Sequence, residues 1–369
     1  MDAPRTPLER LELLRRAVTD GVGPVAIAVH DYPDPDALAG AFGMQHLLRR
    51  WELDVDIYHG GGLGRPENRV MTELVGIRLK LFRERSDWSG WRGVVVVDTQ
   101  PAARNHSIPR ELPILAVVDH HLLPPAPAEP AAEAAHFRHF ETAALPSPGP
   151  RMKYEDVRAD GGCSSALVYE YLQNEGIVPS RTLATALFLG VQTDTDDLLR
   201  DACPLDRVTY VSLLALVDMN VVRQVRRPLL SRSFYALMAR ALRRARKRGQ
   251  ALVSDCGDIP APDQLSAISD LLIQSADAEW ALALGRHKGS VYLSLRLRNA
   301  EGLGTRVLRK VVEPEGGSAG GHRRAAGGQA TPPDGDLDRT AKALIRNFLE
   351  LVDPAREPDQ PLLPPEPLP

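Results

Sequence analysis

The stretch Val25-Ala26-Ile27-Ala28-Val29-His30-Asp31-Tyr32-Pro33-Asp34-Pro35-Asp36-Ala37 decides the fold of the N-terminal half. Its first five residues are apolar and predict a buried parallel strand. Open α/β sheets keep their sites beyond the carboxyl ends of such strands, where His30, Asp34 and Asp36 fall. The two prolines disfavour helical geometry in the residues before them, so we expect the next helix to begin only near Asp36. One imidazole and two carboxylates suit a divalent cation; the alternative is an Asp that caps the helix and a His bonded to backbone.

Two further apolar stretches end in the same residue types. The stretch Gly93–Val97 precedes Asp98, and Ile114–Val118 precedes Asp119-His120-His121. Neighbouring parallel strands would bring these ends together at one edge of the sheet. An explanation by helix caps or turns would have to apply at all three strands. In an extended segment His120 and His121 face opposite ways, so one can bind metal while the other faces a substrate.

Acidic residues also follow an expected helix from about Arg181 to Val191, in the segment Gln192-Thr193-Asp194-Thr195-Asp196-Asp197. The carboxyl end of a helix gives an anion no support, so a nearby cation would explain these carboxylates. Upstream, the segment Gly161-Gly162-Cys163-Ser164-Ser165 precedes another apolar helix. We expect Ser164 or Ser165 to cap that helix; phosphate binding at its free amides is the alternative.

Composition limits the class of protein. A chain of 369 residues, 43% of them hydrophobic, can bury a large core and suggests two domains. The net charge of -3 gives no general attraction to nucleic acid. Three cysteines without metal-site spacing fit a reducing compartment, and we interpret them as packing residues. No apolar run approaches about 18 residues, so we expect a cytoplasmic protein without a membrane partner.

The predicted fold class is α/β, with an N-terminal parallel-sheet domain over residues 1–228 and a smaller α/β substrate domain over 229–352. A Pro- and Ala-rich insertion covers about 122–151, and the Pro-rich tail from 353 to 369 is expected to be disordered. The segment His59–Gly64 is expected to be a flexible turn rather than a phosphate cradle. One expected helix carries a basic run, which is a solvated face or a basic wall that attracts polyanions: Arg240, Arg243, Arg244, Arg246, Lys247 and Arg248.

The sequence resembles the DHH phosphoesterase family. The resemblance rests on His30-Asp34-Asp36, on Asp98 at a strand end, on Asp119-His120-His121, which matches the motif that names the family, and on Thr193-Asp194-Thr195. In the C-terminal half, the segment from Gly320 to Gly327 is similar to the glycine-rich signature of the DHH-associated domain. The sequence departs from the usual pattern at Pro35, Gly40 and Ala319, where the family commonly has Gly, Ser and Gly.

The resemblance implies a dimetal centre in a DHH domain and a substrate site in the second domain. His30 and Asp34 would complete one metal site, and the other would hold Asp36, His120 and Asp194. Asp98 is our candidate for a carboxylate that bridges two cations about 3.5–4 Å apart, and these would activate a water as the nucleophile. His121 would contact the scissile phosphate, and Asp119 would orient its neighbours. Mixed His and Asp ligation suits Mn²⁺ and tolerates Mg²⁺ or Co²⁺.

Four residues of the second domain complete the expected site: Arg296, Gly320, Gly321 and His322. An arginine beside a glycine-rich turn suits phosphate recognition, and the resemblance favours Arg296 over Arg298. The leading function is hydrolysis of short oligoribonucleotides, as in nanoRNases, or of 3',5'-bisphosphonucleosides. The alternatives are a cyclic-dinucleotide phosphodiesterase and a non-catalytic nucleotide-binding regulator. The glycine-rich domain favours these nucleotide-acting members over inorganic pyrophosphatase, which has a similar constellation. The expected partner is a short nucleic acid or nucleotide, and a homodimer stays an open alternative.

Overall fold

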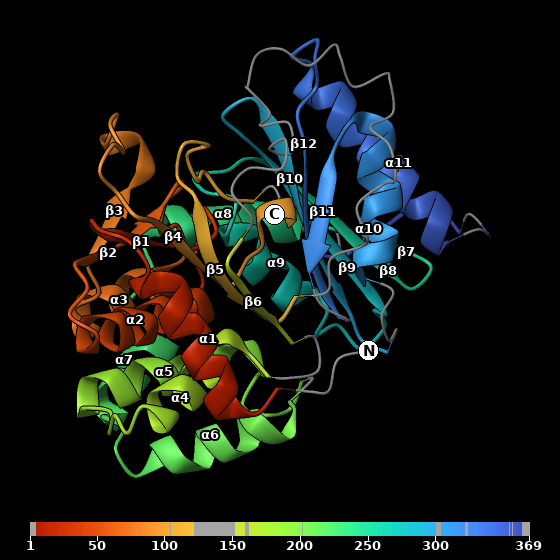
Figure 1. Cartoon of the computed structure of the whole chain (residues 1–369). Coiled ribbons are helices and arrows are strands. Elements are labelled where there is room, and N and C mark those ends of the chain that lie inside the picture. The colour runs from red at the N-terminus through yellow and green to blue at the C-terminus, as the bar shows by residue number, and fades with distance from the viewer. Residues whose placement is uncertain are drawn as a thin grey trace. The chain divides into compact units, whose positions relative to one another are not determined.

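The computed structural model describes residues 5–103, 105–121, 152–158, 162–200, 202–299, 304–321, 324–353, 355 and 357–363. The chain divides into two compact units, Met1–Pro228 and Leu229–Pro369, each with its own β-sheet (Figure 1). The predicted α/β class with an N-terminal parallel sheet is confirmed. The insertion predicted at about 122–151 and the candidate residue His322 lie outside the described residues.

In the first unit, the described strands form a six-stranded parallel sheet with the order β3-β2-β1-β4-β5-β6. The central strand is β1, in which every residue is buried, as its unbroken apolar sequence predicts. The strands are β1 (Val25–Ala28), β2 (Val55–His59), β3 (Leu79–Leu81), β4 (Gly93–Val97), β5 (Ile114–Asp119) and β6 (Tyr154–Val157).

Helices cover one face of this sheet, where α2, α4 and α5 pack closely against one another (Figure 1). The opposite face carries an aromatic cluster formed by Tyr58, Phe82, Trp88 and Trp91. The helices of the unit are α1 (Pro7–Thr19), α2 (Pro35–Arg50), α3 (Pro66–Val75), α4 (Ser164–Asn174), α5 (Arg181–Asp194), α6 (Pro204–Leu214) and α7 (Met219–Arg226). Short 3-10 helices cover Phe82–Glu84 and Pro101–Ala103.

The second unit has a mixed sheet with the order β11-β12-β10-β9-β8-β7-β13, in which only the β8 and β9 pair is parallel among the described strands. Its strands are β7 (Arg246–Arg248), β8 (Ala251–Asp258), β9 (Trp280–His287), β10 (Ser290–Leu297), β11 (Ser318–Gly321), β12 (Ala325–Ala330) and β13 (Gln360–Pro361). Helices α8 (Arg232–Arg244) and α9 (Gln264–Leu272) pack on one face. Helices α10 (Gly304–Val312) and α11 (Leu337–Val352) pack on the other. A 3-10 turn covers Glu313–Glu315.

The predicted helix through the whole basic run is wrong. Helix α8 ends at Arg244, and Arg246–Arg248 form strand β7, which pairs with β8. The pairing with β8 holds Arg246–Arg248 in an extended conformation. Helical periodicity in the sequence does not reveal this pairing. Arg240 is also not a simple solvated residue, because its Nε donates to the Cys256 carbonyl (2.6 Å) and its Nη2 to the Asp258 carbonyl (2.7 Å).

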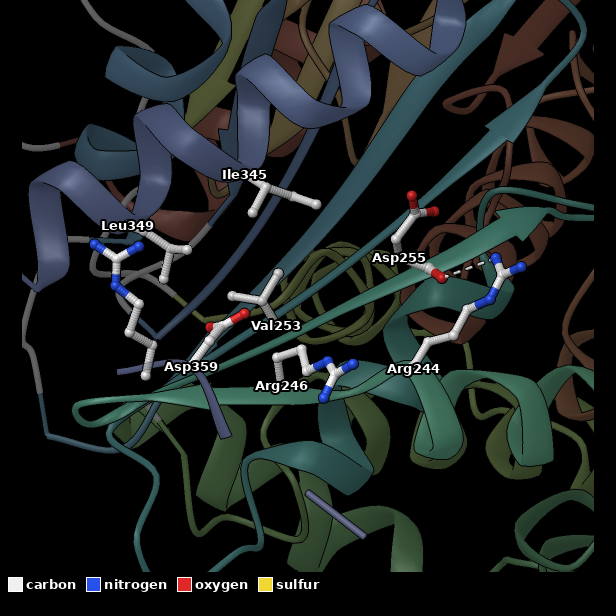
Figure 2. A pocket seen from close by; sticks show the side chains of 8 residues that line it. Arg244, Arg246, Val253, Asp255, Ile345, Leu349 and Asp359 are labelled. Carbon is white, nitrogen blue, oxygen red and sulfur yellow. Dashed lines mark hydrogen bonds between the residues drawn. The ribbon is translucent and has the colours of Figure 1, made fainter. Parts of the chain in front are cut away.

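The structure also differs from the prediction that the tail is disordered from Asp353 onward. Asp353 is buried and accepts a hydrogen bond from Arg248 Nε at 2.8 Å. Strand β13 then pairs with β7, and the Leu362 amide donates to the Ala245 carbonyl at 2.9 Å. The edge of the sheet thus supplies backbone partners that the Pro-rich composition did not predict. Near this edge lies a cavity of about 190 Å³ lined by arginines (Figure 2).

No helix in the described ranges is both long enough and apolar enough to span a membrane.

Candidate metal centre

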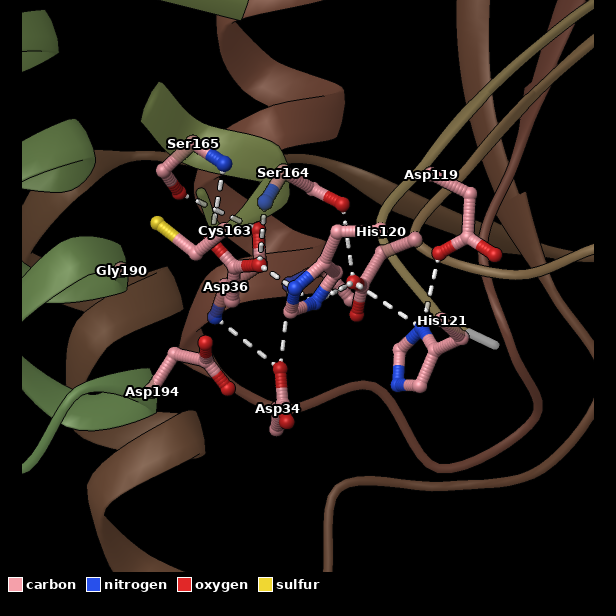
Figure 3. Close-up of polar contacts among 12 residues, drawn as sticks. Asp34, Asp36, Asp119, His120, His121, Cys163, Ser164, Ser165, Gly190 and Asp194 are labelled. Atoms are coloured by element: carbon pink, nitrogen blue, oxygen red, sulfur yellow. Dashed lines mark hydrogen bonds and ion pairs between the residues drawn. The ribbon is translucent and has the colours of Figure 1, made fainter. Parts of the chain in front are cut away.

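The carboxyl ends of β1, β4 and β5 and the end of α5 bring together all six predicted metal ligands in the first unit. Carboxylate and imidazole atoms of the His30, Asp34 and Asp98 group lie within 4.8 Å of one another, as do those of the Asp98, Asp119, His120 and His121 group. Asp194 and Asp36 belong to a third such group. Figure 3 shows Asp34, Asp36, His120 and Asp194 with their polar atoms pointing toward one another.

The loop after β1 is shaped by its two prolines and by Asp34. The Asp34 backbone is extended, and its Oδ1 accepts hydrogen bonds from the Asp36 and Ala37 amides, both at 3.0 Å. Asp34 is therefore the N-cap of α2, and Pro35 takes the first helical position, where its missing N–H costs nothing. The cap and the ligand interpretations are compatible, because one carboxylate oxygen caps the helix while the carboxylate also reaches His30 and Asp98.

Asp98 lies at the middle of the cluster. Its Oδ2 is 3.7 Å from His30 Nε2, and its Oδ1 is 3.3 Å from His120 Nε2. The two oxygens of one carboxylate thus face imidazoles that come from different strand ends. Only 3% of the Asp98 side chain is exposed, and its backbone is left-handed, with φ of 60°.

The start of helix α4 holds Asp36, a contact that the sequence did not predict. The Ser164 amide donates to Asp36 Oδ2 at 2.7 Å, and the Ser165 amide donates to Oδ1 at 2.8 Å. The Ser164 hydroxyl donates to Asp98 Oδ1 at 2.9 Å. The N-cap position belongs to Cys163 rather than to either serine, and a carboxylate distant in sequence takes the place of a capping side chain.

The pair formed by Asp119 and His121 stands beside this cluster. His121 Nδ1 donates to Asp119 Oδ1 at 2.7 Å, and Gln100 Nε2 donates to the other oxygen, Oδ2, at 2.6 Å. Asp119 is fully buried, so both of its oxygens serve to orient neighbours. Burial alone would lower the pKa of His121, but the Asp119 carboxylate outweighs it and raises that pKa to about 9.

Crowding of buried carboxylates dominates the electrostatics. Burial raises the pKa of Asp36 well above its ordinary value, and the nearby carboxylates of Asp98 and Asp194 add to this. Burial also raises the pKa of Asp194. Burial would lower the pKa of His120, yet Asp194 and Asp98 raise it well above its usual range. For Asp98, burial is outweighed by the hydrogen bond from His120 and by the other histidines, so its pKa is lowered.

This donor set fits divalent cations. Buried carboxylates that repel one another are stabilised by a cation between them, and imidazole nitrogens with carboxylate oxygens suit Mn²⁺. Cys163 is the chemically different neighbour, because its Sγ lies within 4.8 Å of ligand oxygens of Asp36 and Asp194. Burial raises the pKa of the Cys163 thiol well above its ordinary value, which favours the neutral thiol.

The turn after α5 fixes Asp194. Arg200 Nη2 donates to the Asp194 carbonyl at 2.7 Å and so supplies the positive charge that the helix end lacks. Asp196, Asp197 and Leu198 all have positive φ, between 49° and 67°. Asp197 anchors this left-handed turn, since it accepts from Gln192 Nε2 at 2.5 Å and pairs with Arg226 at 3.0 Å.

In the second unit, the predicted substrate residues among the described ranges lie on β10 and β11, the two strands that flank β12. Arg296, on β10, donates from Nε to Asp270 Oδ1 at 2.5 Å. Gly320 and Gly321 lie on β11, which is joined to β10 through β12. A Cβ at Gly321, where φ is 140°, would lie 2.4 Å from the Ala325 carbonyl oxygen, so only glycine fits there. Arg298 instead donates to the Ile273 and Ala276 carbonyls at 3.0 Å each, which fixes the end of α9.

The sequence is similar to those of known proteins. Residues 24–191 match the family model described as "DHH family, N-terminal domain". An uncharacterized protein of Methanocaldococcus jannaschii is 29% identical over 320 residues, which are 86% of this chain and 60% of that protein. A probable manganese-dependent inorganic pyrophosphatase of Streptococcus suis is 26% identical over 170 residues, 45% of this chain and 46% of that protein. The aligned parts are less than two thirds of these relatives.

A solved structure has a similar fold. The exopolyphosphatase-related protein from Bacteroides fragilis superposes with a TM-score of 0.66 and 14% sequence identity, over 92% of this chain and 96% of that one. At this identity the likeness concerns the fold alone.

Proposed function

Because residues 24–191 match the N-terminal domain model of the DHH family, we propose that the protein is a metal-dependent phosphoesterase that acts on short oligoribonucleotides or 3',5'-bisphosphonucleosides. The observation that carries the proposal is the place of Asp98, whose two carboxylate oxygens face His30 at 3.7 Å and His120 at 3.3 Å. A carboxylate between two sets of ligands is what a pair of cations requires.

The residues divide into two ligand sets that share Asp98. His30 and Asp34 form one set, and the other contains Asp36, His120 and Asp194. Two divalent cations, with Mn²⁺ as the first choice, would polarise the phosphate and activate a water molecule. The manganese-dependent pyrophosphatase relative and the mixed His and Asp ligation support this choice over Mg²⁺ or Co²⁺.

The chain holds these ligands in place before substrate arrives. The two amides at the start of α4 fix both oxygens of Asp36, and the Ser164 hydroxyl fixes Asp98. Asp119 holds Nδ1 of His121, so Nε2 is the ring atom through which His121 would contact the phosphate. Such prior orientation lowers the cost of reaching the transition state.

The second unit would bind the part of the substrate that does not react. Arg296 is already oriented by Asp270, and a substrate phosphate would share or replace that ion pair. Gly320 and Gly321 leave backbone accessible to a close ligand, and His322 is proposed beside them from the family resemblance.

A substrate panel tests this proposal. Purified protein with Mn²⁺ is offered dinucleotides to pentanucleotides, a 3',5'-bisphosphonucleoside, cyclic dinucleotides and pyrophosphate, and products are separated by chromatography. We expect the linear dinucleotide or the bisphosphonucleoside to give the highest kcat/KM. Asp98→Asn should abolish the activity, whereas Asp20→Asn, at a carboxylate that is 80% exposed, should not. No turnover of any compound would favour a non-catalytic regulator.

Inorganic pyrophosphate hydrolysis is the second candidate, supported by the Streptococcus suis relative. That similarity covers 45% of this chain, so it bears on less than half of the sequence. A preference for pyrophosphate over every nucleotide in the panel would replace the leading proposal with this one, and a preference for cyclic dinucleotides would point to a cyclic-dinucleotide phosphodiesterase.

A further inference from the structure

The basic segment between α8 and β8 lines a cavity that the proposed reaction does not use. The cavity has a volume of about 190 Å³ and belongs entirely to the second unit. Three of its lining residues are arginines, Arg244, Arg246 and Arg248, and Val253, Ile345 and Leu349 form an apolar side (Figure 2). The cavity lies near the β7 edge of the sheet, whereas Gly320 and Gly321 lie on β11 at the other edge.

Two of the charges around the cavity are neutralised by partners. Arg248 Nε donates to Asp353 Oδ2 at 2.8 Å. The lining carboxylate of Asp255 accepts from Arg286 Nη1 at 2.6 Å and from its Nη2 at 3.0 Å, a bidentate pair that lowers the pKa of Asp255 despite its burial. Neither Arg248 nor Asp255 therefore contributes much net charge to the space.

The other two arginines are not compensated in this way. Within the described ranges, no carboxylate lies at ion-pair distance from Arg244 or Arg246. Arg244 Nη1 donates to the Asp255 carbonyl at 3.4 Å, and its charge adds a smaller contribution to the lowered pKa of the Asp255 carboxyl. Asp359, on the segment leading into β13, is the remaining acidic residue of the lining. The cavity thus presents two guanidinium groups against one exposed carboxylate.

We propose that this cavity binds inorganic phosphate or a small phosphate monoester between Arg244 and Arg246. Two guanidinium groups match the two negative charges of a phosphate, and their planar forks suit its oxygens. The volume corresponds to about six water molecules at roughly 30 Å³ each, which admits a phosphate with a small substituent but no nucleic-acid strand. The apolar side formed by Val253, Ile345 and Leu349 accommodates such a substituent.

Site-resolved protection of arginines tests this proposal in the full-length protein. The metal-free chain is treated with phenylglyoxal, which modifies guanidinium groups, with and without millimolar inorganic phosphate, and each modified arginine is identified by mass spectrometry. Phosphate should slow modification of Arg244 and Arg246 severalfold. Arg243, an exposed neighbour on α8 that does not line the cavity, is the internal control and should react unchanged. Because the readout is local, phosphate bound at the metal centre does not affect it.

Two variants sharpen the test. Asp359→Asn removes the remaining carboxylate and should lower the phosphate concentration needed for half-protection of Arg244 by about threefold. Arg246→Ala should raise it by about tenfold or more. Replacing phosphate with phenyl phosphate separates the two ligands, since tighter protection by this small monoester would identify the apolar side as part of the site. Equal protection of Arg243 and Arg246, or no protection in the wild-type chain, would overturn the proposal.

Discussion

Asp98 has a strained backbone conformation, but its carboxylate lies where it can contact both His30 and His120. Its left-handed φ of 60° costs about 1–2 kcal/mol for a residue with a side chain. The surrounding hydrogen bonds, from the Asp98 amide to the Val118 carbonyl at 3.0 Å and from Ser164 to its carboxylate at 2.9 Å, hold it there. The pattern of apolar strands ending in Asp or His predicted which residues meet. It did not predict this conformation or the Ser164 contact, because Ser164 lies 66 positions away in sequence.

His121 should act on substrate without holding metal. Because its Nδ1 is bonded to Asp119, His121→Ala is expected to lower kcat by about 10²–10³-fold and to leave metal content unchanged. The matched variant is His120→Ala, in which the imidazole nearest Asp98 is lost and metal content should fall. Metal analysis and steady-state kinetics on both variants check this, and equal loss of metal from the two would contradict it.

Arg296 should affect substrate binding rather than chemistry. We expect Arg296→Ala to raise KM for a dinucleotide by about tenfold, because a charge-assisted contact to phosphate is lost. Arg298→Ala is the comparison, since Arg298 donates to carbonyls at the end of α9 and its loss should lower stability instead. An unchanged KM in the Arg296 variant would remove this residue from the substrate site.

At the scale of elements, local periodicity predicted a helix or strand correctly where the signals that form it lie within its own sequence. Helix α2 begins at Pro35, directly after the Asp34 cap, and both signals are local in the sequence. The same approach did not identify α3 or β3, and it extended α8 through residues that pair as β7. Strand pairing depends on a partner elsewhere in the chain, so the basic sequence of Arg246–Arg248 alone does not predict that these residues form a strand.

Close packing of α4 against α5 should determine how well Asp36 is positioned to bind metal. A Cβ at Gly190 on α5 would lie 2.0 Å from Ser165 Oγ, and the Ser165 amide holds Asp36. We therefore expect Gly190→Ala to cost about 1–3 kcal/mol of stability and to weaken metal binding. The double variant Gly190→Ala/Ser165→Ala lacks the Ser165 hydroxyl and should regain part of the lost stability and part of the lost metal affinity.

Thermal unfolding and metal titration measure these effects. Gly62→Ala is the control, because a Cβ there meets no atom within 4 Å. If Gly190→Ala bound metal as tightly as the Gly62 variant does, the start of α4 would not be what positions Asp36.

At the scale of the whole molecule, the sequence indicated two α/β parts and the order of their motifs. Those features follow from composition and from the apolar pattern, which are properties of the chain itself. The ordered part of the tail did not follow, because Asp353 depends on Arg248 and the residues of β13 depend on pairing with β7.

Stability of the metal-free protein should depend on pH in a defined direction. The pKa of His121 is raised from 6.5 to about 9, and that of His120 is raised as well. A raised pKa in the folded state adds stability that is fully present below the unfolded value and is lost as pH rises through the folded one. The melting temperature of chelator-treated protein should therefore fall between pH of about 6.5 and about 9.

Mn²⁺ should reverse this trend, because cations replace the protons on the buried ligands and bind only the folded chain. The increase in melting temperature caused by Mn²⁺ should grow with pH over the same range. A metal-free protein whose melting temperature rises with pH there would contradict the assigned electrostatics.

The most direct test of the dimetal centre is a titration of the metal-free protein with Mn²⁺, followed by electron paramagnetic resonance. If Asp98 bridges two cations, the wild-type chain should take up two equivalents and develop the spectrum of an exchange-coupled pair. Asp98→Asn should give only the spectrum of isolated ions. Saturation at one equivalent in the wild-type chain, or a coupled spectrum that persists in Asp98→Asn, would contradict the account.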